Sequence, residues 1–241
     1  LIAENGVVLG ESERFRFDLA LIVSQIDLDR VLPRWGMALP LAGLGVVIGN
    51  PRNTFYLEAL DALVNWDDFS VVSATLSVTS PLFDRVVADH FQNNFSLCAR
   101  LQEAGFRRPG LVIHNHHDRR CGHSITAAYA WHGTYGGVEA VRAHVCEKVD
   151  AAALRVWLRT EKPDVVLAEH DALARQLREA GIFPAGLPLV SCSARPLADG
   201  TFPFSGNYDN PEEIGAAAVE ELARKIATGQ PAGPAASRSA P

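Results

Sequence analysis

The sequence lacks an excess of basic residues. Its 22 lysines and arginines are outnumbered by 28 aspartates and glutamates, which gives a net charge of −6. A surface that binds the phosphate backbone of a nucleic acid normally carries a basic patch, and no such patch is visible along the chain. The charge balance therefore argues that any action on DNA requires a further segment.

The sequence also lacks a long apolar run. The longest one, residues 38–48, contains Pro40 and two glycines, and it is shorter than the roughly 20 residues that cross a bilayer. No CxxC pair or zinc-type spacing connects the four cysteines, which are Cys98, Cys121, Cys146 and Cys192. This usage is typical of a reducing compartment, where thiols pack as small apolar groups. We therefore predict a cytoplasmic protein with no membrane partner.

Nucleotide-binding loops are absent as well. The chain contains neither a Gly-x-x-x-x-Gly-Lys loop nor a Gly-x-Gly-x-x-Gly turn. Hydrophobic residues make up 48% and charged residues 21% of the chain, which are values of a globular protein. We therefore expect a folded protein with no cofactor.

Short apolar runs alternate with segments of helical periodicity. The runs that we expect to be strands are residues 7–9, 44–48, 69–73, 85–87, 111–113, 165–168 and 189–192. They are nearly continuous in apolar character, as in strands covered on both faces. Periodicity predicts helices over residues 89–104, 150–159, 171–180 and from Pro211 onward. This alternation predicts an α/β fold with parallel sheets and helices on both faces.

Local signals mark the ends of several predicted helices. Asp89 can cap the helix that follows it, with Gln92 as its capping-box partner. Gly105 stands where that helix should stop. Asn210 followed by Pro211 and two acidic residues is a strong helix start. These signals delimit the first and last predicted helices more sharply than periodicity does.

Four segments carry strand–helix patterns in a fixed order. They are residues 85–90 with 101–112, residues 163–171, residues 177–191 and residues 207–218. The first segment resembles the pattern V-x-x-D-N followed by L-x-x-x-G-[HY]-[RK]-[RK]-I, and the second resembles P-D-A-[VI]-x-x-x-N-D. The third resembles L-x-x-x-G-x-x-V-P-x-D-[IV]-x-[VL]-x-[GS]. The fourth resembles a hinge strand followed by a P-x-x-[ML]-G-x-x-A helix. These are patterns of the LacI/GalR family of transcription regulators. The chain departs from them at Pro109 in place of Ile, at His170 in place of Asn, and at Ser193-Ala194 in place of an acidic pair.

The resemblance, which covers about residues 44–230, implies a particular architecture. It implies two Rossmann-like subdomains with parallel sheets, of the periplasmic-binding-protein-like type I. Residues 1–88 plus 208–228 would form the N-terminal subdomain and residues 89–207 the C-terminal one. Residues 229–241, rich in Pro, Ala, Gly and Ser, are predicted to be disordered. The first strand and helix, and a DNA-binding helix-turn-helix domain, are expected to precede Leu1 in a longer protein.

The resemblance also implies a function. The chain would be the ligand-sensing domain of a regulator that acts as a homodimer and binds a small polar effector, such as a carbohydrate, between two lobes. Closure of the lobes would then change the affinity for operator DNA. This interpretation makes the protein a non-enzyme with no catalytic residue. Two alternatives stay open at this point: a solute-binding protein of a sugar transporter, and a metal-dependent hydrolase.

Effector contacts are expected where strands end, because ligands of parallel sheets bind beyond the carboxyl ends of the strands. Asn50 and Ser73 lie at the ends of the second and third predicted strands, and Ser193 follows the last one. Asp89 occupies the strand end of the first family-like segment. We expect these four side chains to contact the effector.

Two further effector contacts are expected, each with an alternative. Arg120 precedes a predicted helix, near the place where the family has an effector-binding arginine, and its guanidinium suits hydroxyls and anions. Its alternative is a solvated loop residue. Asp171 can accept hydrogen bonds from ligand hydroxyls, with the N-cap of the next helix as its minimum role.

A cluster of imidazoles follows the strand predicted at residues 111–113. His114, His116, His117 and Asp118 are all ligand types that zinc accepts. Ligands so close in sequence rarely all reach one ion without help from elsewhere. We interpret the cluster as a polar loop lining the mouth of the crevice and predict no metal.

Overall fold

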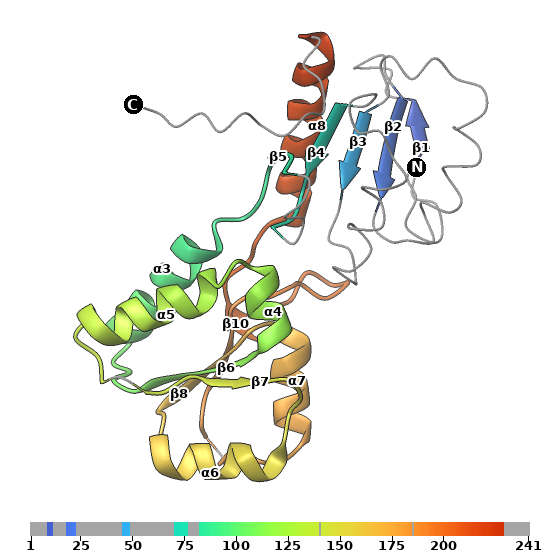
Figure 1. Ribbon diagram of the computed structural model, residues 1–241. Helices are drawn as coiled ribbons and strands as arrows, with labels where there is room; N and C mark the ends of the chain where they lie inside the picture. The colour runs from blue at the N-terminus through green and yellow to red at the C-terminus, as the bar shows by residue number, and fades with distance from the viewer. Residues whose placement is uncertain are drawn as a thin grey trace. The chain divides into compact units, whose positions relative to one another are not determined.

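The computed structural model describes residues 9–11, 18–22, 45–48, 70–76, 82–139, 141–184 and 186–228. The chain divides into two compact units, shown in Figure 1. Unit 1 comprises Leu1–Val87 and Asn210–Pro241, and unit 2 comprises Ala88–Asp209. The predictions about Asn50 and about the tail at residues 229–241 lie outside the described residues.

Unit 2 is built around one parallel sheet. The order of its five strands is β10-β9-β8-β6-β7, and every pair is parallel. The strands are β6 (Pro109–His114), β7 (His144–Cys146), β8 (Val165–Ala168), β9 (Leu189–Ser191) and β10 (Ser205–Gly206). The helices are α3 (His90–Glu103), α4 (Asn115–Arg120), α5 (Ser124–Tyr135), α6 (Ala151–Glu161) and α7 (Asp171–Glu179).

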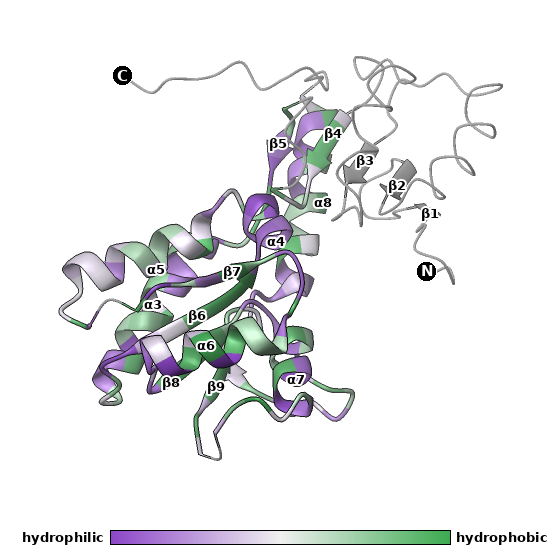
Figure 2. Cartoon of the chain, turned by 60° about the horizontal axis from the view of Figure 1, so that its bottom comes forward, coloured by the Kyte–Doolittle hydropathy of each residue, from purple (hydrophilic) through white to green (hydrophobic). Residues whose placement is uncertain are grey.

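Both faces of this sheet are covered. Leu111 and Ile113 of β6 pack in one apolar cluster with residues of α3 and α5. The residue between them, Val112, belongs to a second cluster with Leu154 of α6 and Leu177 of α7. Successive side chains of a strand point to opposite faces, so a strand covered on both sides must be apolar throughout. Figure 2 shows this apolar character along β6 and the mixed polarity of the helices that flank it.

The cysteines all belong to unit 2 and are free thiols. Cys98, Cys121 and Cys192 lie in the apolar cluster between the sheet and the α3–α5 layer. Cys146 is half-buried at the end of β7. The expectation that the cysteines pack as small apolar groups therefore holds for the three buried thiols.

The ends of α3 follow the sequence signals in part. Oδ1 of Asp89 accepts the backbone N–H of Gln92 at 2.8 Å, as expected of an N-cap. The reciprocal half of the predicted capping box is wrong, because the Gln92 amide donates to Ser96 Oγ at 3.3 Å instead. Gly105 has a φ of +96° and ends the helix, in the left-handed conformation that favours glycine.

Periodicity did not reveal several elements of unit 2, although a helix was expected after Arg120, where α5 lies. The segment expected to be a polar loop after β6 is the helix α4, which is six residues long and buries only Asp118. So short and polar a helix has no apolar stripe to reveal it. The apolar residues of α5 are spread around its axis, and β10 has two exposed residues. Periodicity therefore could not find these elements.

Unit 1 contains a second sheet, with strand order β1-β2-β3-β4-β5. Its strands are β1 (Leu9–Glu11), β2 (Asp18–Ile22), β3 (Gly45–Ile48), β4 (Ser70–Ser73) and β5 (Asp84–Arg85). All neighbours are parallel except β1 and β2. Only six residues join β1 to β2, too few for the crossover that a parallel pair needs.

The helix α8 (Pro211–Ala227) packs against β4 and β3. Asn210 caps it as predicted, with its side chain accepting the N–H of Glu213. Ala218 and Leu222 bury their side chains against Val72 of β4. Among the described residues, no helix is both long and apolar enough to cross a membrane.

Gly215 lies inside α8, where a substitution can measure the cost of a glycine within the helix. A Cβ at this position would meet no atom within 4 Å, and glycine inside a helix is destabilising relative to alanine by about 0.5–1 kcal/mol. Gly215→Ala is therefore expected to raise the free energy of unfolding by about that amount in urea titrations. The contrasting variant is Gly206→Ala, whose Cβ would lie 1.9 Å from the backbone oxygen of Ser191. A stabilising effect of Gly206→Ala would contradict the close approach of β10 to the backbone of Ser191 in β9.

Candidate functional site at the carboxyl edge of the unit 2 sheet

Polar side chains gather where the parallel strands of unit 2 end. The helix α4 follows β6 directly, and the sequence Glu169-His170-Asp171 follows β8. Ser193 comes after β9 and Asp209 after β10. The carboxyl ends of parallel strands meet at one edge of a sheet, which is where ligands of α/β proteins bind. This edge is the candidate site.

Glu169 is the buried centre of the edge, with a fully buried side chain. Its Oε2 accepts the backbone N–H of His114 at 2.5 Å, and its Oε1 lies 2.7 Å from Nδ1 of His114. Nε2 of His170 lies 3.1 Å from the same Oε1. Burial alone would raise the pKa of Glu169, but the hydrogen bonds from His170 and His114 outweigh it and lower the pKa to about 2. Unit 2 therefore holds a carboxylate that stays ionised in its interior.

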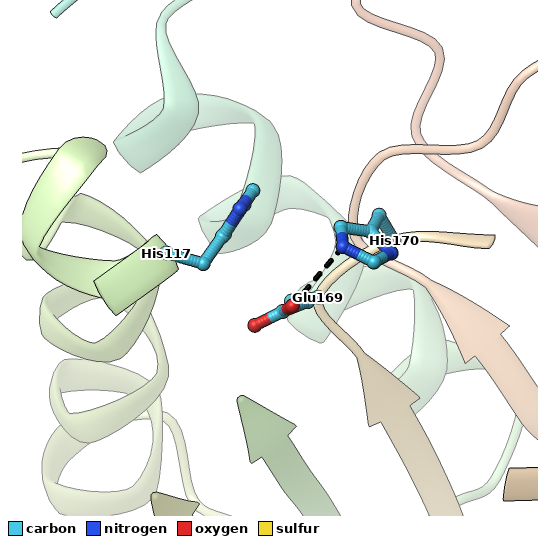
Figure 3. A group of neighbouring side chains, drawn as sticks. All are labelled: His117, Glu169 and His170. Atoms are coloured by element: carbon cyan, nitrogen blue, oxygen red, sulfur yellow. Dashed lines mark ion pairs between the residues drawn. The ribbon is translucent and has the colours of Figure 1, made fainter. Parts of the chain in front are cut away.

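His117 projects from α4 beside this carboxylate (Figure 3). Burial lowers the pKa of His117 to about 4, although the charge of Glu169 acts in the opposite direction. Its ring lies 5.3 Å from the ring of His170 at an interplanar angle of 84°. The Sγ atom of Cys121 lies 3.6 Å from Nε2 of His117. At neutral pH this imidazole is uncharged and can act as a hydrogen-bonding group or a metal ligand.

Donor atoms of three residues converge here. In the part of the chain that the structure describes, His117, Glu169 and His170 form a group whose possible ligand atoms all lie within 4.8 Å of one another. Figure 3 shows His117 reaching the group from α4, while Glu169 and His170 come from the junction of β8 and α7. Two imidazoles and a carboxylate are a donor set that could hold a divalent metal ion.

A second polar network joins the ends of β9 and β10 to α3. Ser193 Oγ donates to Oδ2 of Asp209 at 2.8 Å, and Nδ2 of Asn93 donates to Oδ1 at 3.1 Å. The side chain of Asn207 donates to the backbone oxygen of Asn93 at 3.0 Å. Asp209 is thus an acceptor fixed by donors from two elements. Ser193, expected to contact the effector, lies in this network, and its effector role stays a prediction.

Asp171 differs from its expected minimum role. The N-cap of α7 is His170, whose Nδ1 accepts the N–H of Leu173 at 3.1 Å. Asp171 is the first residue of the helix, and its Oδ2 accepts the N–H of Arg195 at 2.7 Å. The prediction that Asp171 is the cap is wrong, because its carboxylate bonds the chain beyond β9. Its role as an effector contact remains untested.

The other predicted contacts are dispersed. Arg120 is the last residue of α4 and is half-buried, and its charge contributes to lowering the pKa of His117. Asp89 caps α3. Ser73 belongs to unit 1, where it is fully buried and its Oγ donates to the backbone oxygen of Thr75 at 2.9 Å. Arg120, Asp171 and Ser193 are therefore the predicted residues that the unit 2 edge gathers.

Sequence reasoning missed Glu169, His170 and His117 as members of one cluster. A signal was present for the first two, because three polar residues follow the apolar strand β8 without interruption. For His117 the signal was its place just after β6, the strand that pairs with β8. With the pairing of β6 and β8 known, both segments are predicted to lie at the same edge of the unit 2 sheet.

The sheets and their flanking helices define an α/β fold of the periplasmic-binding-protein-like type, and the predicted fold class is confirmed. No known protein-family model matches the chain, and no curated protein matches it in sequence. Solved structures do match it. The transcription regulator CcpA of Lactococcus lactis has a TM-score of 0.59 at 14% identity, over 84% of this chain and 76% of that chain.

Two further solved structures agree with the first. A PurR family transcriptional regulator from Vibrio parahaemolyticus has a TM-score of 0.58 at 16% identity, over 83% of this chain and 78% of that chain. The Escherichia coli transcriptional repressor ascG has a TM-score of 0.55 at 16% identity, over 88% of this chain and 79% of that chain. The chain thus shares the fold of transcription regulators of the LacI and PurR type.

Proposed function

We propose that this chain is the ligand-sensing domain of a LacI-type transcription regulator, and that its unit 2 edge binds a small polar effector. The shared fold and the four ordered family-like segments support this proposal. The acidic net charge of −6 supports DNA binding by a separate segment of the full protein, for which the family resemblance implies a helix-turn-helix domain. The regulator acts as a homodimer in the cytoplasm.

The chemistry of the edge favours a polyhydroxylated ligand. Carboxylates of Asp171 and Asp209 and the hydroxyl of Ser193 supply acceptors, while Arg120 and His117 supply donors. A sugar hydroxyl both donates and accepts, so a site with both kinds of group can satisfy several hydroxyls of one ligand. The effector class we propose is therefore a carbohydrate or a related metabolite.

The observation that carries the proposal is the state of the Asp171 carboxylate. Its Oδ1 is buried and finds no hydrogen-bond donor among the described residues. A buried acceptor without a donor is costly, and proteins rarely leave one in that state. An effector hydroxyl would supply the donor in the bound state.

A thermal shift experiment tests this function. The chain is melted with a panel of monosaccharides, sugar phosphates and nucleosides. A true effector at 100 times its Kd is expected to stabilise the fold by about 2.7 kcal/mol, which corresponds to a rise in Tm of roughly 5–10 °C for a chain of this size. Asp171→Asn should reduce the shift, because the amide loses an acceptor oxygen.

Asp199→Asn is the matched control, since Asp199 is exposed and bonds only its own turn at Thr201 among the described residues. It should leave the shift unchanged. A panel with no stabilising compound, or equal shifts in both variants, would count against the proposed site. A ligand that binds without altering the operator affinity of the complete protein would instead favour a solute-binding role.

A further inference from the structure

The cluster of His117, Glu169 and His170 has the composition of a metal site. Its three side chains come from two segments, α4 and the β8–α7 junction, that follow neighbouring parallel strands. Their possible ligand atoms lie within 4.8 Å of one another (Figure 3). Two imidazole nitrogens and a carboxylate oxygen are donors that zinc and other late first-row metals accept in proteins.

The distances need only small adjustments to bind an ion. Two ligands about 2.1 Å from one tetrahedral ion lie roughly 3.4 Å apart. Nε2 of His170 is already 3.1 Å from Oε1 of Glu169. The remaining separations, up to 4.8 Å, exceed this spacing by at most about 1.4 Å, which side-chain rotation can supply.

The carboxylate of Glu169 is also held in its orientation by His114. Oε2 of Glu169 accepts the backbone N–H of His114, and the His114 ring contacts Oε1. Ligands of metal sites are typically fixed by such a second layer of hydrogen bonds. His114 would play this orienting part for Glu169.

The hydrogen bonds of His170 add a consequence for α7. Its Nδ1 accepts the N–H of Leu173, so the ring hydrogen is on Nε2, the atom that faces Glu169. A metal on Nε2 displaces that hydrogen, and a neutral ring then carries its hydrogen on Nδ1. Two N–H groups would face each other there, and the first turn of α7 would lose its cap.

We propose that His117, Glu169 and His170 bind a divalent transition-metal ion, zinc being the best match, and that its binding releases the His170 cap of α7. The metal site goes beyond the proposed effector function and requires neither effector nor DNA. The fourth position would be taken by water or by a group of a bound ligand.

Isothermal titration of the metal-stripped 241-residue chain with zinc chloride tests the site. One ion per chain is expected. His117→Asn and His170→Asn should each weaken binding by more than about 100-fold, since even loss of an outer-layer partner costs 10–100-fold. The asparagine introduced by His170→Asn would still cap α7, because asparagine is a strong N-cap residue.

His123→Asn is the control. His123 is exposed, contacts Asp118 rather than the cluster, and has a φ of +59° that asparagine tolerates. The zinc affinity of the His123→Asn variant should equal that of the unmodified chain. Circular dichroism of each variant shows whether it is folded.

Two measurements on the unmodified chain need no variant. X-ray absorption of the zinc-loaded chain should show a nitrogen and oxygen shell with two imidazoles, and hydrogen exchange of the Leu173 amide should accelerate on loading. Absence of zinc uptake, or a sulfur-rich shell, would overturn the site. Uptake that leaves Leu173 exchange unchanged would overturn the link to α7. Because no effector or DNA is present, these outcomes are independent of the thermal shift result.

Discussion

Replacing Glu169 by glutamine is expected to lower the free energy of unfolding by about 3 kcal/mol, the typical cost of breaking a buried, charge-assisted network. The carboxylate is fully buried and accepts N–H groups of His114 and His170 on its two oxygens. A glutamine offers only one oxygen, so its NH2 group would face a donor. Urea unfolding followed by tryptophan fluorescence, in EDTA at pH 7, measures the difference.

The same variant should change how stability depends on pH. The pKa of Glu169 is about 2 in the folded protein, below its ordinary value of 4.5. The folded state therefore holds this group ionised more strongly than the unfolded state does. Its contribution is fully present above pH 4.5 and is lost as the pH falls toward 2. The stability gap between the unmodified chain and Glu169→Gln should narrow below about pH 4.5.

Glu147→Gln is the control for both measurements. Glu147 is exposed just beyond β7 and accepts a hydrogen bond from Asn115 at 2.7 Å. Its replacement should change stability by less than about 0.5 kcal/mol, as for most surface positions. An equal loss in the two variants, or a gap that is constant with pH, would show that Glu169 is not the buried anion described above.

Asp84→Ala is expected to destabilise unit 1 by about 3 kcal/mol, because it leaves a buried ammonium group without its counter-charge. Lys225 of α8 is 1% exposed, and its Nζ lies 2.6 Å from Asp84 of β5 and 3.2 Å from the backbone oxygen of Val71. After the substitution the lysine keeps one neutral acceptor among the described residues. Urea unfolding of the variant checks this value.

Replacing the other partner of this ion pair, Lys225, should destabilise unit 1 much less. Lys225→Met removes the buried charge and keeps an unbranched chain of similar length, while Asp84, with a side chain 34% exposed, can be hydrated. A cost below about 1.5 kcal/mol is expected, as for other volume-conserving changes. Similar costs for both variants would mean that the pair contributes through packing rather than through charge.

The architecture could be predicted where strands and helices carry strong local signals. The strands β6 and β8 were found because they are covered on both faces and are therefore apolar at every position. The start and end of α3 followed from Asp89 and Gly105, whose conformations are set by local chemistry. The short helix α4 was missed, since one buried residue, Asp118, leaves no pattern.

The site could be predicted only in outline. Strand ends indicated Asp171 and Ser193, but not that Glu169 turns inward. Its burial depends on His114, which is 55 residues away in the chain, and local sequence carries no information about such a contact. His170 was treated as a departure from the family pattern. Its capping of α7 is shown by the hydrogen bond that its Nδ1 accepts from the Leu173 N–H, which the family pattern does not predict.

The positions of the cysteines offer a practical way to follow the opening of unit 2. Every cysteine is in unit 2, and burial raises the pKa of Cys98 and of Cys121 to about 12. Alkylating reagents attack the thiolate and need access to it, so Cys146 should be labelled first. The three buried thiols become reactive only when unit 2 opens. Their labelling rates therefore report the opening of unit 2 separately from that of unit 1, in the natural sequence and without an added probe.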